Sequence, residues 1–319
     1  MNLKRLTYRS IATGLNALSY LAPARAGRYA FQLFATPPPP RIRPKEQAFL
    51  DTATRLDRQL GNYRVPVYQW GDANAPICVT AYGWGYNAGR WRHFVPALVE
   101  AGYRVIAFDP PGHGHSKAPR FLTYPIMAEI EVELIRSLGG VELVLAHSFG
   151  GSCLVEALTR LPEGLRPRRM CLMAIVSEVR WLFAGFAQFM GFREVVYQQM
   201  QRRIEELTGR KLDEFDVALV ADRLRDVPTL LVHDPQDGVT AFRNALRNHS
   251  HWRGSWLYSP EGAGHHLGTA EVTRNILDWL TTQGGGAAGW KQNTGGIAPL
   301  PAVVDPRDME VDGVTNFYG

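Results

Sequence analysis

From Tyr63 onward, short apolar runs alternate with helical segments, and this alternation predicts a parallel β-sheet covered by helices. Several runs are almost entirely apolar, as expected for strands that are buried on both faces. The predicted strands are residues 63–70, 77–82, 105–109, 141–147, 170–176, 230–233 and 255–258. Apolar residues recur every four positions from Ile126 to Leu138 and predict a helix, and a similar pattern from Val272 to Leu280 predicts the last helix. The fold class is therefore α/β, with a mostly parallel central sheet.

Residues 177–226 interrupt this order with a segment that is predicted to be helical, and an inserted helical lid over the carboxyl edge of the sheet would explain it. The segment contains five clustered aromatic residues, namely Trp181, Phe183, Phe186, Phe189 and Phe192. Of these, Trp181, Phe186 and Phe189 are candidates for lining an apolar substrate pocket. The alternative is that the aromatic residues form the lid's own core, because large apolar side chains are mostly structural.

Residues 1–45 form a basic leader. They hold eight of the 35 Lys and Arg residues and none of the 30 Asp and Glu residues. Apolar residues at helical spacing predict one or two amphipathic helices before the stiff Pro37–Pro40 linker. Such helices could lie on an anionic membrane surface. They could also form an arm packed on their own domain, which is the favoured interpretation because amphipathic helices usually pack on protein.

Length and composition indicate one large globular domain. At 319 residues, with 45% hydrophobic residues, the chain can bury a single large core. We expect a catalytic domain at 46–283 that includes the lid, followed by a Gly-rich flexible tail at 284–319. Nucleic-acid binding is excluded because the basic residues are concentrated in the leader and no base-reading motif is present.

Cysteine usage and hydropathy indicate where the protein resides. Cys78, Cys153 and Cys171 are scattered singly, without the paired spacing of a disulfide framework or a zinc site. No apolar run reaches the length of about 18 residues that a membrane span requires. The expected location is cytoplasmic, with at most a weak peripheral contact between the leader and the inner membrane face.

The sequence Val-Leu-Ala-His-Ser-Phe-Gly-Gly at 144–151 carries the main chemical signal. An apolar strand leads into a tight turn with one serine, and small residues then open a helix, which is the pattern of a nucleophile elbow. Ser148 is the candidate nucleophile. The usual pattern is Gly-x-Ser-x-Gly, and Ala146 replaces its first glycine while Gly150 is retained.

Two later strands end in candidate partners for Ser148. Residues 230–237 read Leu-Leu-Val-His-Asp-Pro-Gln-Asp, and Glu261-Gly-Ala-Gly-His265 frees a histidine after a glycine turn. The order serine, acid, histidine at the ends of successive strands is one of the orders found in catalytic triads. From the residues alone, Asp234 competes with Asp237, and His266 competes with His265. Glu178, after an earlier strand, is an alternative acid.

With two further motifs, residues 60–283 resemble the α/β-hydrolase superfamily, near its small bacterial esterase-like members. These motifs are Ala81-Tyr-Gly-Trp-Gly85 and Phe108-Asp-Pro-Pro-Gly-His-Gly-His-Ser116. The resemblance favours His265 as general base and Asp237 as the carboxylate that orients it. It also implies that the backbone N–H groups of Trp84 and Phe149 form the oxyanion hole. Tyr82 replaces the histidine that usually precedes this Gly-Trp loop.

The resulting prediction is a serine hydrolase that cleaves carboxylic esters through an acyl-enzyme. A small-molecule acyl substrate is expected, without a cofactor or a metal ion. Asp109 is expected to brace its turn, and His147 to have a packing or supporting role. The same triad would also serve an acyltransferase, a thioesterase or a C–C bond hydrolase, because these enzymes differ in what fills the pocket. A catalytically weak ligand-binding homologue is the alternative from outside the enzymes.

Overall fold

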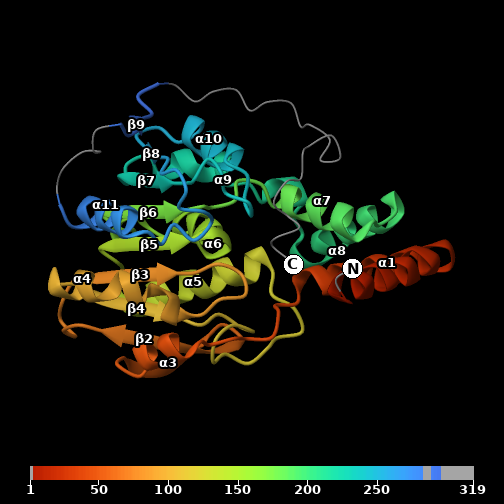
Figure 1. Cartoon of the computed structure of the whole chain (residues 1–319), viewed down its shortest axis with the longest axis horizontal. Coiled ribbons are helices and arrows are strands. Elements are labelled where there is room, and N and C mark those ends of the chain that lie inside the picture. Colours follow the sequence, from red (N-terminus) through yellow and green to blue (C-terminus); the bar gives the residue numbers. More distant parts are fainter. Residues whose placement is uncertain (1–2, 283–288, 296–319) are drawn as a thin grey trace. The chain divides into compact units, whose positions relative to one another are not determined.

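The computed structural model describes residues 3–282 and 289–295, which fall into two compact units (Figure 1). The first, called the helical unit here, contains residues up to 36 and residues 178–216. The second, called the sheet unit, contains residues 37–177 and the described residues from 217 onward. This division differs from the expected one. The part of the leader up to residue 36 joins the segment at 178–216 in one unit. Residues 37–45 of the leader and residues 217–226 of the expected lid belong to the sheet unit.

A mixed sheet is the centre of the sheet unit, and its strands are ordered β1-β2-β4-β3-β5-β6-β7-β8-β9. The pairs β1–β2, β2–β4 and β8–β9 are antiparallel, and the other neighbours are parallel. The strands are β1 (Thr54–Leu60), β2 (Tyr63–Trp70), β3 (Ile77–Ala81), β4 (Arg104–Phe108), β5 (Leu143–His147), β6 (Arg169–Met173), β7 (Thr229–Val232), β8 (Trp256–Tyr258) and β9 (Lys291–Gln292). The predicted α/β class and mostly parallel sheet are confirmed.

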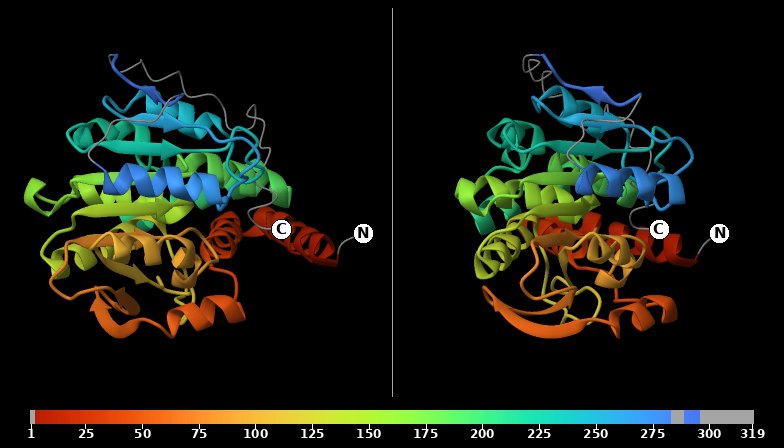
Figure 2. Two further views of the ribbon diagram at one scale, coloured as in Figure 1. Left: turned by 60° about the vertical axis from the view of Figure 1, so that its left-hand side comes forward. Right: turned by 90° about the vertical axis from the view of Figure 1, so that its left-hand side faces the viewer.

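Helices cover both faces of this sheet. The helices α4 (Val95–Glu100) and α11 (Ala270–Thr281) lie on one face, and α5 (Tyr124–Leu138) and α6 (Ser148–Thr159) lie on the other (Figure 2). The sheet unit also contains α3 (Pro44–Leu50), α9 (Val217–Val220), α10 (Arg243–Ser250) and the short 3₁₀ helices η1 (Ala88–His93), η2 (Glu163–Leu165) and η4 (Ala221–Leu224). All five residues of β5 are buried, which explains its apolar sequence.

The seven predicted strands are present, and their ends differ from the expected ones by at most three residues. The largest difference is at β6. It was predicted to continue to Val176 but ends at Met173, because Ala174 adopts a left-handed backbone with φ +48°.

Two strands were not predicted. β1 is a polar edge strand whose side chains are mostly exposed, so it lacks an apolar pattern. The signal that could have revealed it is the two-residue Gly61-Asn62 turn between Leu60 and Tyr63. β9 lies in the expected flexible tail, where Trp290 stacks on Tyr258 at 5.1 Å and brings the chain to the sheet edge. The rest of the predicted tail, residues 284–288 and 296–319, lies outside the described residues.

The helical unit contains α1 (Leu3–Leu21), α2 (Pro23–Ala35), α7 (Val179–Met190), α8 (Glu194–Thr208) and the short η3 (Leu212–Glu214). Helix α2 crosses α8 closely, and a Cβ atom at Gly27 would lie only 2.1 Å from Cβ of Gln199. Glycine is therefore required at this crossing. No helix in the described ranges is both long enough and apolar enough to span a membrane.

Glu131 on α5 is a buried acid in the core of the sheet unit. Its side chain is 1% exposed, and neither carboxyl oxygen has a hydrogen-bond partner among the described residues. Burial raises the pKa of Glu131 well above its ordinary value. In the unfolded chain this carboxyl ionises near pH 4.3. The stability of the folded state is therefore highest below that pH and is lost as the pH rises through the raised pKa.

The Glu131→Gln variant removes this ionisation, so we expect it to be more stable than the wild type at alkaline pH. The melting temperature should rise by roughly 5 °C at pH 8 and by less at pH 5. Scanning calorimetry across this pH range measures the difference. The matched control is Glu100→Gln on the exposed part of α4, which should show no such trend. An equal change for Glu131→Gln at both pH values would contradict the prediction.

Candidate active site

Ser148 lies at the sharp turn between β5 and α6, with a left-handed backbone of φ +50°. Such a conformation is strained for a residue with a Cβ atom and is typical of functional turns. The neighbouring backbone is very close. A Cβ at Gly83 would lie 2.9 Å from Cβ of Ser148, and a Cβ at Gly150 would lie 2.4 Å from the carbonyl oxygen of Tyr82. Ala146 is tolerated in place of the usual glycine because its φ is not positive.

The Ser148 hydroxyl is buried and unpaired. The residue is 1% exposed, and its Oγ has no hydrogen-bond partner in the described ranges. A buried polar atom without a partner costs about 1–3 kcal/mol. Because native proteins keep few such atoms, each one suggests a functional reason.

His265 and Asp237 lie together at the ends of two other loops. Nδ1 of His265 lies 2.8 Å from Oδ2 of Asp237, and the His265 side chain is 8% exposed. Because a carboxylate only accepts hydrogen bonds, Nδ1 carries the proton and Nε2 presents a lone pair. This is the tautomer that a general base needs.

Asp237 is held as a carboxylate by a dense set of donors. Its Oδ1 accepts from the backbone N–H groups of Val239 at 2.7 Å and Thr240 at 3.1 Å, and its Oδ2 accepts from the Thr240 hydroxyl at 2.8 Å. Nε2 of His233 lies 3.3 Å from Oδ2. Burial alone would raise the pKa of Asp237, but the hydrogen bonds from His233 and His265 hold it well below its ordinary value.

The competing acids have other partners. Asp234 accepts from the backbone N–H groups of Gln236 at 2.8 Å and Gly264 at 2.6 Å, so it fixes the turn that leads to His265. Glu178 belongs to the helical unit, where its backbone pairs with that of Asp216. The acid that contacts the His265 ring is therefore Asp237.

His147 links the turn at Ser148 to His265. Its Nε2 donates to the backbone carbonyl of His265 at 2.8 Å, and the ring of Tyr82 stacks on it at 4.5 Å. Burial and the neighbouring His265 lower the pKa of His147 well below its usual value, so the ring is neutral near pH 7. The residue next to Ser148 thus fixes the backbone of the candidate base, in agreement with the predicted supporting role.

His266 has a different environment from His265. Its Nε2 lies 2.9 Å from the Tyr86 hydroxyl, and the Arg90 guanidinium stacks on the Tyr86 ring at 4.6 Å. Loss of hydration and the charge of Arg90 lower the pKa of His266 to about 4. Tyr86 and Arg90 could not be identified from the sequence, because their spacing from His266 along the chain carries no signal.

The side-chain rings of the two residues predicted to supply the oxyanion donors are in contact. The rings of Trp84 and Phe149 are 5.3 Å apart, edge to face, and the Trp84 loop follows Gly83, which borders Ser148.

Asp109 braces the neighbouring turn as predicted. It accepts from the backbone N–H of Ala88 at 2.8 Å and from that of His115 at 2.9 Å.

Comparison with known proteins identifies the family. The profile of the alpha/beta hydrolase family matches residues 77–272, which is more than half of the chain. The chain belongs to the alpha/beta hydrolase family.

The relatives of this alpha/beta hydrolase have names that refer to different activities. Epoxide hydrolase A of Mycobacterium tuberculosis is 35% identical over 78 residues, covering 24% of each chain. The magnesium-chelatase 30 kDa subunit of Rhodobacter capsulatus is 30% identical over 172 residues, covering 53% of this chain and 55% of that protein. The matched region thus spans less than two thirds of either relative.

Solved structures agree on the fold. An esterase from Exiguobacterium antarcticum has a TM-score of 0.55 at 20% identity, covering 72% of this chain and all of that one. A bacterial membrane phospholipase A has a TM-score of 0.56 at 18% identity, covering 74% of this chain and 87% of that one. The predicted α/β-hydrolase fold and family are confirmed.

Two of the three aromatic residues predicted to line a pocket, Phe186 and Phe189, contact other rings of the helical unit. Phe186 lies 5.4 Å from Phe34, and Phe189 lies 5.5 Å from Tyr8. Trp181 is 2% exposed. A pocket of about 320 Å³ in this unit is lined by other residues, namely Ala184, Ala187, Gln188, Gly191, Phe192, Glu194 and Tyr197. A substrate role for Trp181, Phe186 and Phe189 therefore stays a prediction.

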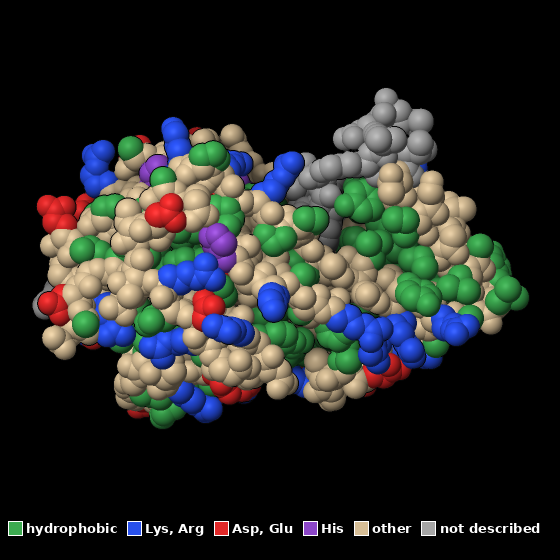
Figure 3. All heavy atoms as spheres, turned by 90° about the horizontal axis from the view of Figure 1, so that it is seen from below, with side chains coloured by type: hydrophobic (Ala, Val, Ile, Leu, Met, Phe, Trp, Pro, Cys, Tyr) green, Lys and Arg blue, Asp and Glu red, His purple; other side chains and the backbone are tan. Residues whose placement is uncertain are grey.

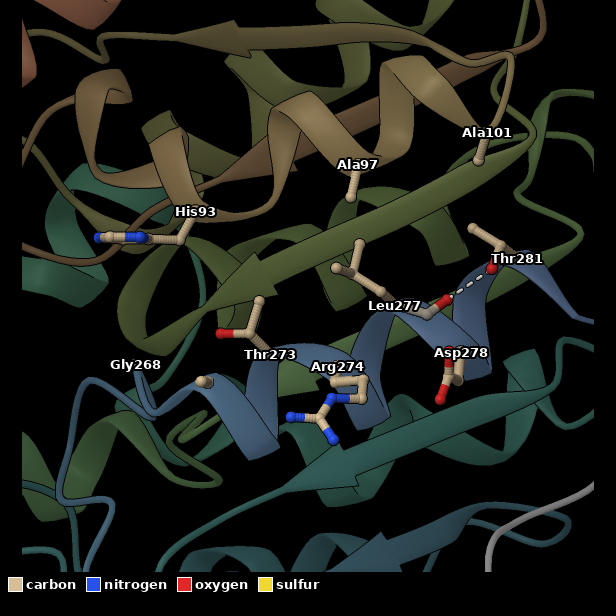
Figure 4. Close-up of a pocket in the computed structure, with 10 residues that line it drawn as sticks. His93, Ala97, Ala101, Gly268, Thr273, Arg274, Leu277, Asp278 and Thr281 are labelled. Atoms are coloured by element: carbon tan, nitrogen blue, oxygen red, sulfur yellow. Dashed lines mark hydrogen bonds between the residues drawn. The ribbon is translucent and has the colours of Figure 1, made fainter.

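A larger groove of about 730 Å³ lies between α4 and α11 in the sheet unit (Figure 4). Ala97 and Ala101 border it on one side, and Leu277 of α11 points into it from the other. None of the polar residues that line it is buried, and it includes neither Ser148 nor His265. We therefore assign it no part in the chemistry.

Proposed function

We propose that this alpha/beta hydrolase cleaves carboxylic esters through an acyl-enzyme formed on Ser148. The observation that carries the proposal is the 2.8 Å hydrogen bond between His265 and Asp237, together with a strained serine whose hydroxyl has no partner among the described residues. The hydrogen bond between His147 and the His265 carbonyl connects these two features. In unliganded enzymes the bond between nucleophile and base is often long and tightens in the complex.

Acylation uses the proton positions described above. As Oγ of Ser148 attacks the ester carbonyl carbon, Nε2 of His265 takes the hydroxyl proton, and the carbonyl π electrons move onto oxygen. Asp237 stabilises the imidazolium that forms. The backbone N–H groups of Trp84 and Phe149 donate to the oxyanion, and losing one such donor typically costs about 10²–10³ in rate.

The tetrahedral intermediate then collapses. The carbonyl re-forms, the bond to the alcohol oxygen breaks, and His265 gives its proton to that oxygen, which leaves the acyl group on Ser148. In deacylation, a water molecule attacks the acyl carbon while His265 accepts its proton. The second collapse releases the carboxylic acid and returns the proton to Ser148.

Ser148 at the turn favours ester hydrolysis over the other reactions that appear in the relatives' names. The matched proteins are called epoxide hydrolase, chloroperoxidase and magnesium-chelatase subunit, so names alone give no common reaction. A serine hydroxyl that an imidazole base deprotonates suits acyl transfer, because the alkoxide is generated only as it attacks. An acyltransferase, a thioesterase or a C–C bond hydrolase would use the same steps with a different leaving group or acceptor.

A fluorophosphonate probe tests the proposal, because an activated serine attacks phosphorus and displaces fluoride. We expect one stable adduct on the wild type, assigned to Ser148 by peptide mass spectrometry, and none on Ser148→Ala. The control variant Ser137→Ala, on α5, should label like the wild type. A folded wild type that stays unlabelled, or that carries the adduct elsewhere, would refute the proposal. A panel of esters, thioesters and acyl acceptors then identifies the preferred reaction.

A further inference from the structure

The corner between α1 and α2 exposes an unusual amount of apolar surface. Leu21 is 90% exposed and Tyr20 is 73% exposed at the end of α1, and Tyr29 is 54% exposed on α2. A single exposed apolar residue needs no explanation, but a cluster marks an interaction site. We call Tyr20, Leu21, Arg25, Arg28 and Tyr29 the α1–α2 corner.

The charge of this corner is uniformly positive. Arg25 and Arg28 are exposed on the same helix as Tyr29, and within the described part of the chain neither contacts a carboxylate. No Asp or Glu occurs before Glu46. Over the helical unit, Figure 3 shows hydrophobic side chains gathered beside a row of Lys and Arg. The combination suits a partner that is apolar inside and anionic at its surface.

The corner is held in place by the helical unit. Nδ2 of Asn16 donates to the carbonyl of Gly191 at 2.8 Å, and the backbone N–H of Arg193 donates to Oδ1 of Asn16 at 2.9 Å. Nη1 of Arg193 donates to the Ser19 hydroxyl at 2.9 Å, and its guanidinium lies 3.7 Å from the centre of the Tyr20 ring. The end of α1 is thus fixed to the connection between α7 and α8. Exposure of Leu21 is a property of the folded unit.

We propose that the α1–α2 corner docks this protein onto the surface of an anionic lipid bilayer. Leu21 enters the acyl region, and Tyr20 and Tyr29 lie at the level of the headgroups, where aromatic side chains with a polar end are enriched. Arg25 and Arg28 pair with lipid phosphates. The contact is interfacial, with the helices lying on the membrane. It is independent of the chemistry at Ser148.

Co-sedimentation of the full chain with vesicles tests this docking. The wild type is expected to bind phosphatidylglycerol-containing vesicles and to bind pure phosphatidylcholine vesicles much more weakly. Because each basic residue near an anionic surface contributes about 1 kcal/mol, Arg25→Gln with Arg28→Gln should weaken binding about 30-fold. Leu21→Ser should weaken binding to both kinds of vesicle by at least about 10-fold.

Matched controls come from the sheet unit. Leu246, 49% exposed on α10, and Arg136, exposed on α5, offer the same substitutions away from the corner. Leu246→Ser with Arg136→Gln should bind like the wild type, and so should Ser148→Ala, which separates docking from catalysis. Unchanged melting temperatures show that the corner variants are folded.

Equal binding by the corner variants and the wild type would overturn the proposal, and so would binding without dependence on anionic lipid. A dimer in solution that Leu21→Ser converts to a monomer would also overturn it, because the corner would then contact a second copy of the chain.

Discussion

Replacing Ser148 with alanine is expected to lower kcat for ester hydrolysis by about 10⁶-fold, the size of loss seen when the nucleophile of a serine triad is removed. The KM should change little, because the hydroxyl contributes to bond formation more than to substrate binding. Removing a buried hydroxyl that has no partner among the described residues leaves no donor unsatisfied, so the melting temperature should stay equal or rise. Kinetics with p-nitrophenyl esters and calorimetry on the same samples measure both quantities.

Ser152 provides the control, one helical turn further along α6. Its hydroxyl donates to the Val176 carbonyl at 2.9 Å and accepts from the Val176 backbone N–H at 2.9 Å. Ser152→Ala therefore leaves buried backbone groups unpaired, and we expect a lower melting temperature with kcat within about tenfold of the wild type. Ser148→Ala should thus lose activity and keep its stability, whereas Ser152→Ala should lose stability and keep most of its activity. Ser148→Ala that keeps more than about 1% of the wild-type kcat would contradict Ser148 as nucleophile.

The central strands could be predicted because strands that are buried on both faces have continuous apolar sequences. β5 is the clearest example, since all its residues are buried and it ends one residue before the proposed nucleophile. The edge strands carry no such signal. β1 is polar because its faces are largely exposed, and β9 is only two residues long and depends on the packing of Trp290.

For the leader, the sequence pattern predicted the helices but not their packing partners. Its amphipathic spacing predicted helices, and α1 and α2 are present. The pattern could not predict which helix α2 contacts, because helical periodicity shows only which side of a helix is apolar and not what packs against that side. That contact depends on the close approach of Gly27 to Gln199 on α8, which is far away along the chain.

The candidate site likewise has one part that the sequence could predict and one part that it could not. The candidate nucleophile, acid and base could be proposed from the sequence because each follows a strand that ends at one edge of the sheet. The donors around them could not. His233 and Thr240 act on Asp237 through a loop conformation, and His147 reaches the His265 carbonyl across 118 residues. The contact between Asp237 and the His265 ring favours Asp237 over Asp234 as the proposed acid, a choice that sequence spacing alone did not support.

Asp237→Asn is expected to lower kcat by about 10⁴-fold, because it forces the base into the wrong tautomer. Oδ1 of Asp237 accepts from two backbone N–H groups, and Oδ2 faces Nδ1 of His265. Asparagine has one carbonyl oxygen. If it accepts from the backbone, its NH₂ group faces Nδ1, so the His265 proton moves to Nε2 and the lone pair needed for Ser148 is lost. Fluorophosphonate labelling should slow in parallel with kcat, since both need the same alkoxide.

Asp234→Asn is the matched control for this effect, because it is the same substitution at a buried acid on the same loop. Asp234 is 1% exposed and accepts only from backbone N–H groups in the contacts described above, without touching the His265 ring. We expect less than about a 100-fold loss of kcat, arising from a looser Gly264 turn and accompanied by a lower melting temperature. Asp237→Asn should instead lose activity with little loss of stability. If Asp234→Asn proves the more damaging to kcat, the carboxylate that orients His265 is Asp234, and the proton positions derived for acylation fail with it.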